Sequence, residues 1–176
     1  MHAWFLRLVA LDASLSQRLR VAERPGLLRR SASILAHSGD SWFWLAGLLA
    51  LALVGDAYWS SAAWKLILAI LVTAVFVLGI KFTVRRSRPP GEWGAVYRSS
   101  DPHSFPSGHA ARAAMLAVLF FAFGLPWLGV LVSFWAVLVS LARVAMGVHY
   151  LSDVLAGGLL GLLLGWLAGL VFGLLG

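Results

Sequence analysis

The stretch "AAWKLILAILVTAVFVLGI", residues 62–80, is an almost unbroken apolar segment that carries a single charge, Lys65. A helix of about 20 apolar residues is long enough to cross the roughly 30 Å hydrocarbon core of a bilayer. The rest of the 176-residue chain has the same character, with 61% hydrophobic and 12% charged residues and a mean hydropathy of +0.88. Soluble domains carry about twice that share of charged residues. The sequence therefore predicts an integral membrane protein.

Four further apolar segments accompany this one. They cover residues 42–55, about 108–124, 127–148 and 152–175, and the turn-forming tripeptide Gly124-Leu125-Pro126 separates two of them. We therefore expect an all-α membrane bundle of about five transmembrane helices. Glycines recur at small-residue spacing along the last span, which predicts close helix packing there: Gly157, Gly158, Gly161, Gly165 and Gly169.

The N-terminal segment has a different pattern. Residues 1–35 mix leucines and aromatic residues with six arginines at roughly helical spacing, which is typical of an amphipathic helix lying in the membrane interface. No linker-like composition divides the chain, so we expect one domain over 1–176, with an interfacial region at 1–40 and a transmembrane bundle at 41–176. The absence of cysteine excludes disulfides and thiolate metal sites.

Ionisable residues stand at the ends of four of the predicted spans. Lys81 to Arg88 follows the second span, 107–109 begins the third, Arg143 to His149 ends the fourth, and Asp153 begins the fifth. Because each helical hairpin returns the chain to the side that it left, all four segments should meet at one membrane face. Ionisable groups at such depths usually mark a functional site, so we expect an active site at this face.

The charges of this cluster suit an anion. Lys81, Arg88 and Arg143 are cations, while Ser107 and Gly108 lie at a helix start, where the backbone dipole favours negative charge. A phosphate group is the ligand that such a pocket binds best.

Two histidines add catalytic chemistry to this pocket. One of His109 and His149 could attack phosphorus while the other protonates the departing oxygen. Asp153 follows His149 by four residues, a spacing that would let its carboxylate orient the imidazole on a helix. Cationic side chains can stabilise the transition state, so we expect neither a metal nor another cofactor.

Three motifs in the chain together resemble those of the type 2 phosphatidic acid phosphatase superfamily, whose soluble relatives include bacterial acid phosphatases and vanadium haloperoxidases. The motifs are "KFTVRRSRP" (residues 81–89), "PSGH" (106–109) and "ARVAMGVHYLSD" (142–153). Ala142 is the one departure, since it stands where the family usually has serine. Three spaced motifs in the right order are more specific than any one of them.

This resemblance implies a role for each site residue. His149 would be the nucleophile, Asp153 its orienting partner and His109 the general acid, while the phosphate oxygens would be held by Lys81, Arg88, Ser107, Gly108 and Arg143. The implied activity is that of a metal-independent lipid phosphatase with a phosphohistidine intermediate. Its substrate would be a polyprenyl diphosphate such as undecaprenyl diphosphate, phosphatidylglycerol phosphate or phosphatidic acid.

Several charged residues outside the motifs have less defined roles. Arg112, one turn beyond His109, either pairs with Glu92 or Asp101 or contacts substrate. Arg85 and Arg86 are expected to be loop or lipid-headgroup charges. We expect Asp40 to cap the first span.

Two other functions remain open at this point. The cations could bind an anion or a lipid headgroup without turnover, or the pocket could hold vanadate as in a haloperoxidase. As partners we expect a lipid phosphate substrate and membrane lipids, with no nucleic acid and no obligatory protein partner. The location is expected to be the bacterial cytoplasmic membrane. The N-terminal arginines favour a cytoplasmic site by the positive-inside rule, but the resemblance favours the outer face, which we expect.

Overall fold

A computed structural model of the chain describes residues 3–91, 93 and 101–175 and confirms the all-α class. The only pairing of extended backbone among these residues is an isolated antiparallel bridge between Ser87 and His103. The helices are α1 (Ala3–Arg18), α2 (Leu27–Ser38), α3 (Ser41–Val54), α4 (Ala57–Val84), α6 (Gly108–Ala122), α7 (Pro126–Ala145) and α8 (Leu151–Val171).

Three of the helices are long and apolar enough to cross a membrane: α4, α7 and α8. Helix α4 is longer than the sequence predicts, because Asp56 caps it by accepting a hydrogen bond of 2.9 Å from the backbone N–H of Trp59. Helices α3 and α6 are apolar but have 14 and 15 residues, about 21–23 Å at a rise of 1.5 Å per residue. They fall short of a typical span, so the count of five spans stays a prediction.

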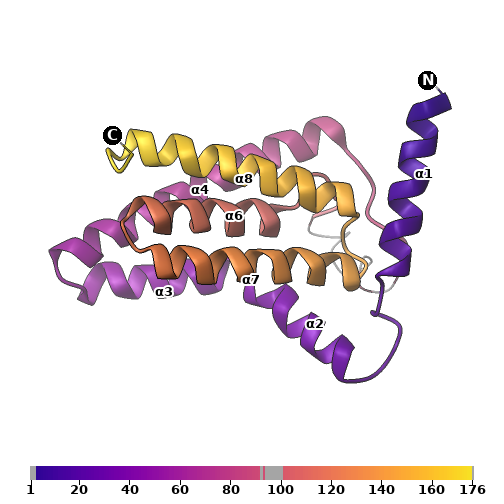
Figure 1. Cartoon of the computed structure of the whole chain (residues 1–176), viewed down its shortest axis with the longest axis horizontal. Helices are drawn as coiled ribbons and strands as arrows, with labels where there is room; N and C mark the ends of the chain where they lie inside the picture. The colour runs from indigo at the N-terminus through magenta and orange to yellow at the C-terminus, as the bar shows by residue number, and fades with distance from the viewer. Residues whose placement is uncertain (1–2, 92, 94–100, 176) are drawn as a thin grey trace.

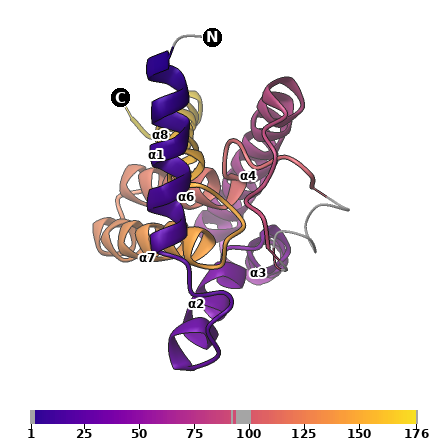
Figure 2. The same cartoon turned by 90° about the vertical axis from the view of Figure 1, so that its right-hand side faces the viewer.

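The N-terminal region forms two helices, where the sequence predicted one. Helices α1 and α2 are separated at Pro25 and Gly26, and Gly26 has a φ of 153°, a backbone conformation that side chains rarely adopt. Figures 1 and 2 show α1 lying across the end of the bundle formed by α6, α7 and α8. Its position at a membrane interface remains a prediction.

Helix α6 occupies the centre of the bundle and packs against α4, α7 and α8 (Figure 1). Its contact with α8 depends on glycine, because a Cβ at Gly157 or Gly161 would overlap the backbone carbonyl oxygen of Ser107 or Ala111. The close packing predicted for this span is therefore confirmed at these positions. Gly158 faces open space and takes no part in it.

The two ends of the bundle differ in chemistry. The C-terminal ends of α4 and α7 and the N-terminal ends of α6 and α8 meet at the end where α1 lies (Figure 1). Toward the other end the core is apolar and includes Leu48, Ile70, Leu116, Leu119 and Val132. Buried polar side chains gather near α1: Lys81, Arg88, Ser104, Ser107, Arg112, Arg143, His149 and Asp153. Folding thus brings all four predicted segments to one end.

Candidate active site

A cavity of about 410 Å³ lies at the polar end of the bundle. Six of the predicted site residues line it: Lys81, Gly108, His109, Arg112, Arg143 and His149. Three others, Arg88, Ser107 and Asp153, are buried outside the cavity lining. Apolar residues of α3 and α4 also line the cavity: Trp42, Ala74, Val77 and Leu78. The cavity lining therefore combines cationic and apolar side chains.

His149 lies in the connection between α7 and α8, and 2% of its surface is exposed. Its Nε2 atom is 3.4 Å from Nη1 of Arg88, and its Nδ1 atom is 3.5 Å from Oδ2 of Asp153. Burial lowers the pKa of His149 well below 6.5, and the charges of Arg143, Arg88 and Lys81 lower it further. The imidazole is therefore neutral at neutral pH and retains the lone pair that a nucleophile needs.

Asp153 contacts His149 in a way that the four-residue spacing did not predict. Helix α8 begins at Leu151, so His149 lies outside the helix. The Asp153 carboxylate accepts hydrogen bonds of 2.8 Å from the Tyr150 N–H and from Nη1 of Arg86. Its separation of 3.5 Å from Nδ1 of His149 exceeds the usual hydrogen-bond range.

Arg86 lies in the loop after α4, as predicted, but it is a partly buried link in this network and not an isolated loop charge. Besides Asp153, its guanidinium donates to Oγ of Ser152 at 2.6 Å and to Oδ2 of Asp12 at 2.7 Å. It also lies over the ring of Tyr150, 4.0 Å from the centroid. Since Asp12 belongs to α1, Arg86 ties the N-terminal helix to the partner of His149.

Lys81 and Arg88 converge on one acceptor, Asp101. The ammonium group of Lys81 donates to the Asp101 carboxylate and, at 3.0 Å, to the carbonyl of His103. Arg88 donates to the same carboxylate at 2.7 Å and to the carbonyl of Val148 at 2.8 Å. The two cations therefore point at a common position that an anionic group can occupy.

Arg143 and the start of α6 add further positive charge to the cavity lining. Arg143 is 2% exposed and lines the cavity from α7. Ser107 is the N-cap of α6: its Oγ accepts a hydrogen bond from the Ala110 N–H at 3.5 Å, and its own N–H donates to the Asp153 carbonyl at 2.9 Å. Gly108, the first residue of α6, faces the cavity, so the positive end of the helix dipole is directed at the same space.

His109 has a partner that sequence reasoning missed. Its Nε2 atom is 2.7 Å from Oδ1 of Asp40, and Nδ1 of His37 is 3.1 Å from Oδ2 of the same carboxylate. Asp40 is the N-cap residue of α3, as predicted, but its side chain makes no capping hydrogen bond and binds the two histidines instead. Burial raises the pKa of Asp40, but hydrogen bonds with His109 and His37 outweigh this effect and lower the pKa to about 2.

Arg112 contacts the connection between α2 and α3. Its guanidinium donates to Oγ of Ser41 and to the carbonyl of Gly39 while it also borders the cavity. Of the partners proposed from sequence, Glu92 lies outside the described residues, whereas Asp101 binds Lys81 and Arg88. Arg112 therefore supports this connection from the cavity side.

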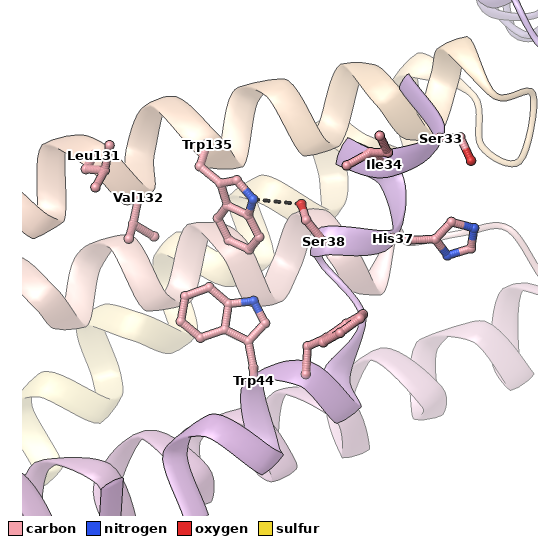
Figure 3. A pocket seen from close by; sticks show the side chains of 9 residues that line it. Ser33, Ile34, His37, Ser38, Trp44, Leu131, Val132 and Trp135 are labelled. Carbon is pink, nitrogen blue, oxygen red and sulfur yellow. Dashed lines mark hydrogen bonds between the residues drawn. The ribbon is translucent and has the colours of Figure 1, made fainter. Parts of the chain in front are cut away.

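A second, apolar pocket of about 850 Å³ lies between α2, α3 and α7 (Figure 3). Trp44 and Trp135 face each other across it, and Nε1 of Trp135 donates to Oγ of Ser38 at 2.9 Å. None of the nine residues that line this pocket is Lys or Arg. This pocket therefore offers no Lys or Arg side chain to an anionic group.

These features define a class of membrane protein, one with a cationic cavity and two histidines at one end of an apolar helical bundle. Comparison with known proteins agrees, since residues 62–174 match the family model of the PAP2 superfamily. A decaprenylphosphoryl-5-phosphoribose phosphatase from Mycobacterium tuberculosis is 39% identical over 151 residues, which cover 82% of this chain and 80% of the relative.

Two solved structures are similar along most of their length. A transmembrane PAP2-type phosphatidylglycerolphosphate phosphatase from Bacillus subtilis has a TM-score of 0.77 and 26% identity, covering 95% of this chain and 87% of the other. Aquifex aeolicus LpxE has a TM-score of 0.69 and 25% identity, covering 90% and 94%. The chain belongs to the PAP2 superfamily of membrane phosphatases. It is an enzyme that hydrolyses phosphate esters.

Proposed function

We propose that this protein hydrolyses a phosphate monoester or diphosphate on a lipid through a phosphohistidine intermediate at His149. The observation that carries this proposal is the placement of His149, a buried neutral imidazole among three cations, in the same cavity as His109. The apolar residues that line the same cavity suit a substrate in which the phosphate is attached to a hydrocarbon chain.

In the first step, Nε2 of His149 attacks phosphorus. Nδ1 faces Asp153, so Nε2 is the nitrogen left to act as the nucleophile. A P–N bond forms as the bond between phosphorus and the leaving oxygen breaks, and that oxygen keeps the electron pair. His109 supplies the proton that neutralises the departing oxygen. The Asp153 carboxylate stabilises the positive charge that develops on His149.

In the second step, His109 accepts a proton from water while the water oxygen attacks phosphorus. The P–N bond breaks, its electron pair returns to His149, and inorganic phosphate leaves. Lys81, Arg88 and Arg143 stabilise the negative charge on the phosphoryl oxygens in both steps, together with the helix start at Ser107 and Gly108. These groups provide the charge stabilisation that a metal would otherwise supply, so neither metal nor cofactor is required.

The relatives support a lipid as the carrier of the phosphate. Their names specify a decaprenylphosphoryl sugar phosphate and a phosphatidylglycerolphosphate as substrates. For this chain we propose three substrate classes to compare: polyprenyl phosphates and diphosphates such as undecaprenyl diphosphate, phosphatidylglycerol phosphate, and phosphatidic acid.

We also propose that α3 and α6 cross the membrane beside α4, α7 and α8, in a bacterial cytoplasmic membrane with the site at the outer face. Residues 41–176 form the catalytic bundle, and residues 1–40 belong to the same domain because Asp12 reaches Arg86. The chain has no cysteine, so single cysteines report sidedness. An outer site predicts that Arg24→Cys reacts with an impermeant thiol reagent in intact cells, whereas Ala57→Cys reacts only after lysis.

The experiment that tests the function is phosphate release from the three lipid classes by the detergent-purified protein, with His149→Ala as control. We expect turnover by the wild type, inhibition by vanadate, and loss of both turnover and acid-labile phosphoenzyme in the variant. Binding without turnover would indicate an anion or headgroup receptor instead. Halide oxidation with vanadate and peroxide, without phosphate release, would indicate a haloperoxidase.

A further inference from the structure

The connection between α2 and α3 brings a carboxylate to His109. This connection belongs to none of the three catalytic motifs. This connection, residues 38–41, places Oδ1 of Asp40 at 2.7 Å from Nε2 of His109. Asp40 has a side-chain exposure of 22% and His109 of 16%, so solvent only partly screens the contact. The motifs account for a carboxylate beside His149 but for none beside His109.

We propose that Asp40 is a positioning residue for His109, holding its ring and stabilising its protonated form during proton transfer. This inference rests on the proposed function, in which His109 is the general acid. Asp40 also lines the cavity, but in this role it acts through His109 and keeps its negative charge throughout.

The carboxylate can act in this way because the connection that carries it is fixed on both sides. On one side Nε1 of Trp135 donates to Oγ of Ser38 at 2.9 Å (Figure 3). On the other side Arg112 donates to the Gly39 carbonyl and to Oγ of Ser41. Helices α6 and α7 therefore hold the residues before and after Asp40.

Gly39 allows the connection to approach the histidine ring closely. A Cβ at this position would lie 2.9 Å from Cδ2 of His109, closer than real Cβ atoms approach a neighbour, and 3.0 Å from Cγ1 of Val139, which is a tight contact. The connection thus contacts one edge of the His109 ring, with Gly39 beside Cδ2 and the Asp40 carboxylate beside the adjacent Nε2.

The contact also decides which nitrogen of His109 transfers the proton. Because Nε2 faces Asp40, Nδ1 is the nitrogen left for the leaving oxygen. In the first step the Nδ1 proton moves to that oxygen, and in the second step Nδ1 takes a proton from water. The Nε2 proton stays in the hydrogen bond to Asp40 throughout, so the ring keeps the orientation that both transfers require.

Charges around His109 make this anion necessary. Arg143 from α7 and Arg112 from its own helix act on the ring as positive charges, and Asp40 is the opposing negative charge from the connection. His37 lies behind Asp40 and shares its carboxylate. Without Asp40, an imidazolium at position 109 would face two guanidinium groups with no counter-charge from the connection.

The test compares Asp40→Asn with the matched control Asp56→Asn, which changes a helix-capping aspartate at the opposite end of the bundle. Substrates are farnesyl phosphate and farnesyl diphosphate, which share a hydrocarbon tail but differ in the leaving group. An alkoxide is a poor leaving group unless it is protonated, whereas a phosphate group is a good leaving group without added protonation. We expect Asp40→Asn to lower kcat on the monophosphate by about 10- to 100-fold and on the diphosphate by less than about 3-fold. The larger loss is part of the roughly 100- to 10,000-fold rate effect of a general acid.

The pH profile supplies a readout that a purely structural role would not change. Loss of the anion lowers the pKa of the group that must be protonated, so the alkaline limb of kcat/KM for the monophosphate should move down by about 1 pH unit. In a His109→Ala background, Asp40→Asn should cause no further loss. Asp56→Asn should leave the profile and the ratio of the two rates unchanged.

Equal losses on both substrates, or an unshifted alkaline limb, would overturn the role of Asp40 while leaving the phosphatase function intact. A wild-type protein that releases phosphate from neither farnesyl substrate nor any lipid of the three classes would overturn the proposed function, and this role with it.

Discussion

Arg86→Ala tests the link between α1 and the active site. The substitution removes hydrogen bonds from Arg86 to Asp153, Ser152 and Asp12. Asp153 is fully buried, so it would keep the hydrogen bond from the Tyr150 N–H but lose its charged partner. We therefore expect a lower free energy of unfolding and a less well fixed orientation of His149.

The magnitude follows from burial. Breaking a buried ion pair costs about 3–5 kcal/mol, and because the Arg86 side chain is 22% exposed we expect the lower end, about 3 kcal/mol. For a chain of this length each kcal/mol corresponds to about 2–4 °C in Tm, so the expected decrease is about 6–12 °C. We expect kcat to fall by about 10- to 100-fold, because misplacing a reacting group by about 1 Å can lower a rate about 100-fold.

The assay measures Tm in detergent together with phosphate release from the best lipid substrate. Arg85→Ala is the matched control, since this neighbouring arginine is exposed and its side chain donates to the Phe82 carbonyl at the end of α4. Arg86→Lys should give intermediate values of Tm and kcat. Lysine keeps the positive charge but lacks the two guanidinium nitrogens that bind Asp12 and Asp153 at the same time.

Equal Tm and kcat values for Arg86→Ala and Arg85→Ala would refute the reasoning. A lower Tm with unchanged kcat would show that Arg86 stabilises the fold but does not position Asp153.

Four further predictions concern the catalytic residues. Asp153→Asn should lower kcat by at least about 100-fold while vanadate still binds, because an amide cannot support the imidazolium of His149; a normal rate would remove Asp153 from the mechanism. Arg143→Lys should weaken vanadate inhibition by about 10-fold, the equivalent of one charge-assisted hydrogen bond, and unchanged inhibition would argue against phosphate contact. Because burial and the neighbouring cations lower the pKa of His149 below 6.5, the acid limb of kcat/KM should lie below pH 6.5; a limb above that value would contradict a neutral nucleophile. Activity should survive EDTA, since in the proposed mechanism Lys81, Arg88 and Arg143 supply the charge stabilisation; loss on chelation that added metal restores would refute this.

Much of the architecture could be predicted from local patterns. A helix forms its hydrogen bonds within its own segment, so apolar length and composition indicate α4, α7 and α8 without tertiary information. Helix α3 was less predictable as a span because its 14 residues fall below the usual length. The break at Pro25 and Gly26 was visible in the sequence, but the amphipathic pattern continues across it and suggested one helix.

The sequence by itself determined the membrane class and the phosphate chemistry, since both depend on residue types at short, fixed spacings. Only the tertiary structure decided the partners of the histidines. Asp40 lies 69 residues from His109, and Arg86 lies 74 residues from Asp12 and 67 from Asp153. Hydrogen bonds across such distances leave no periodic signal in one sequence, because they depend on how α1 and the connection between α2 and α3 pack against the end of the bundle.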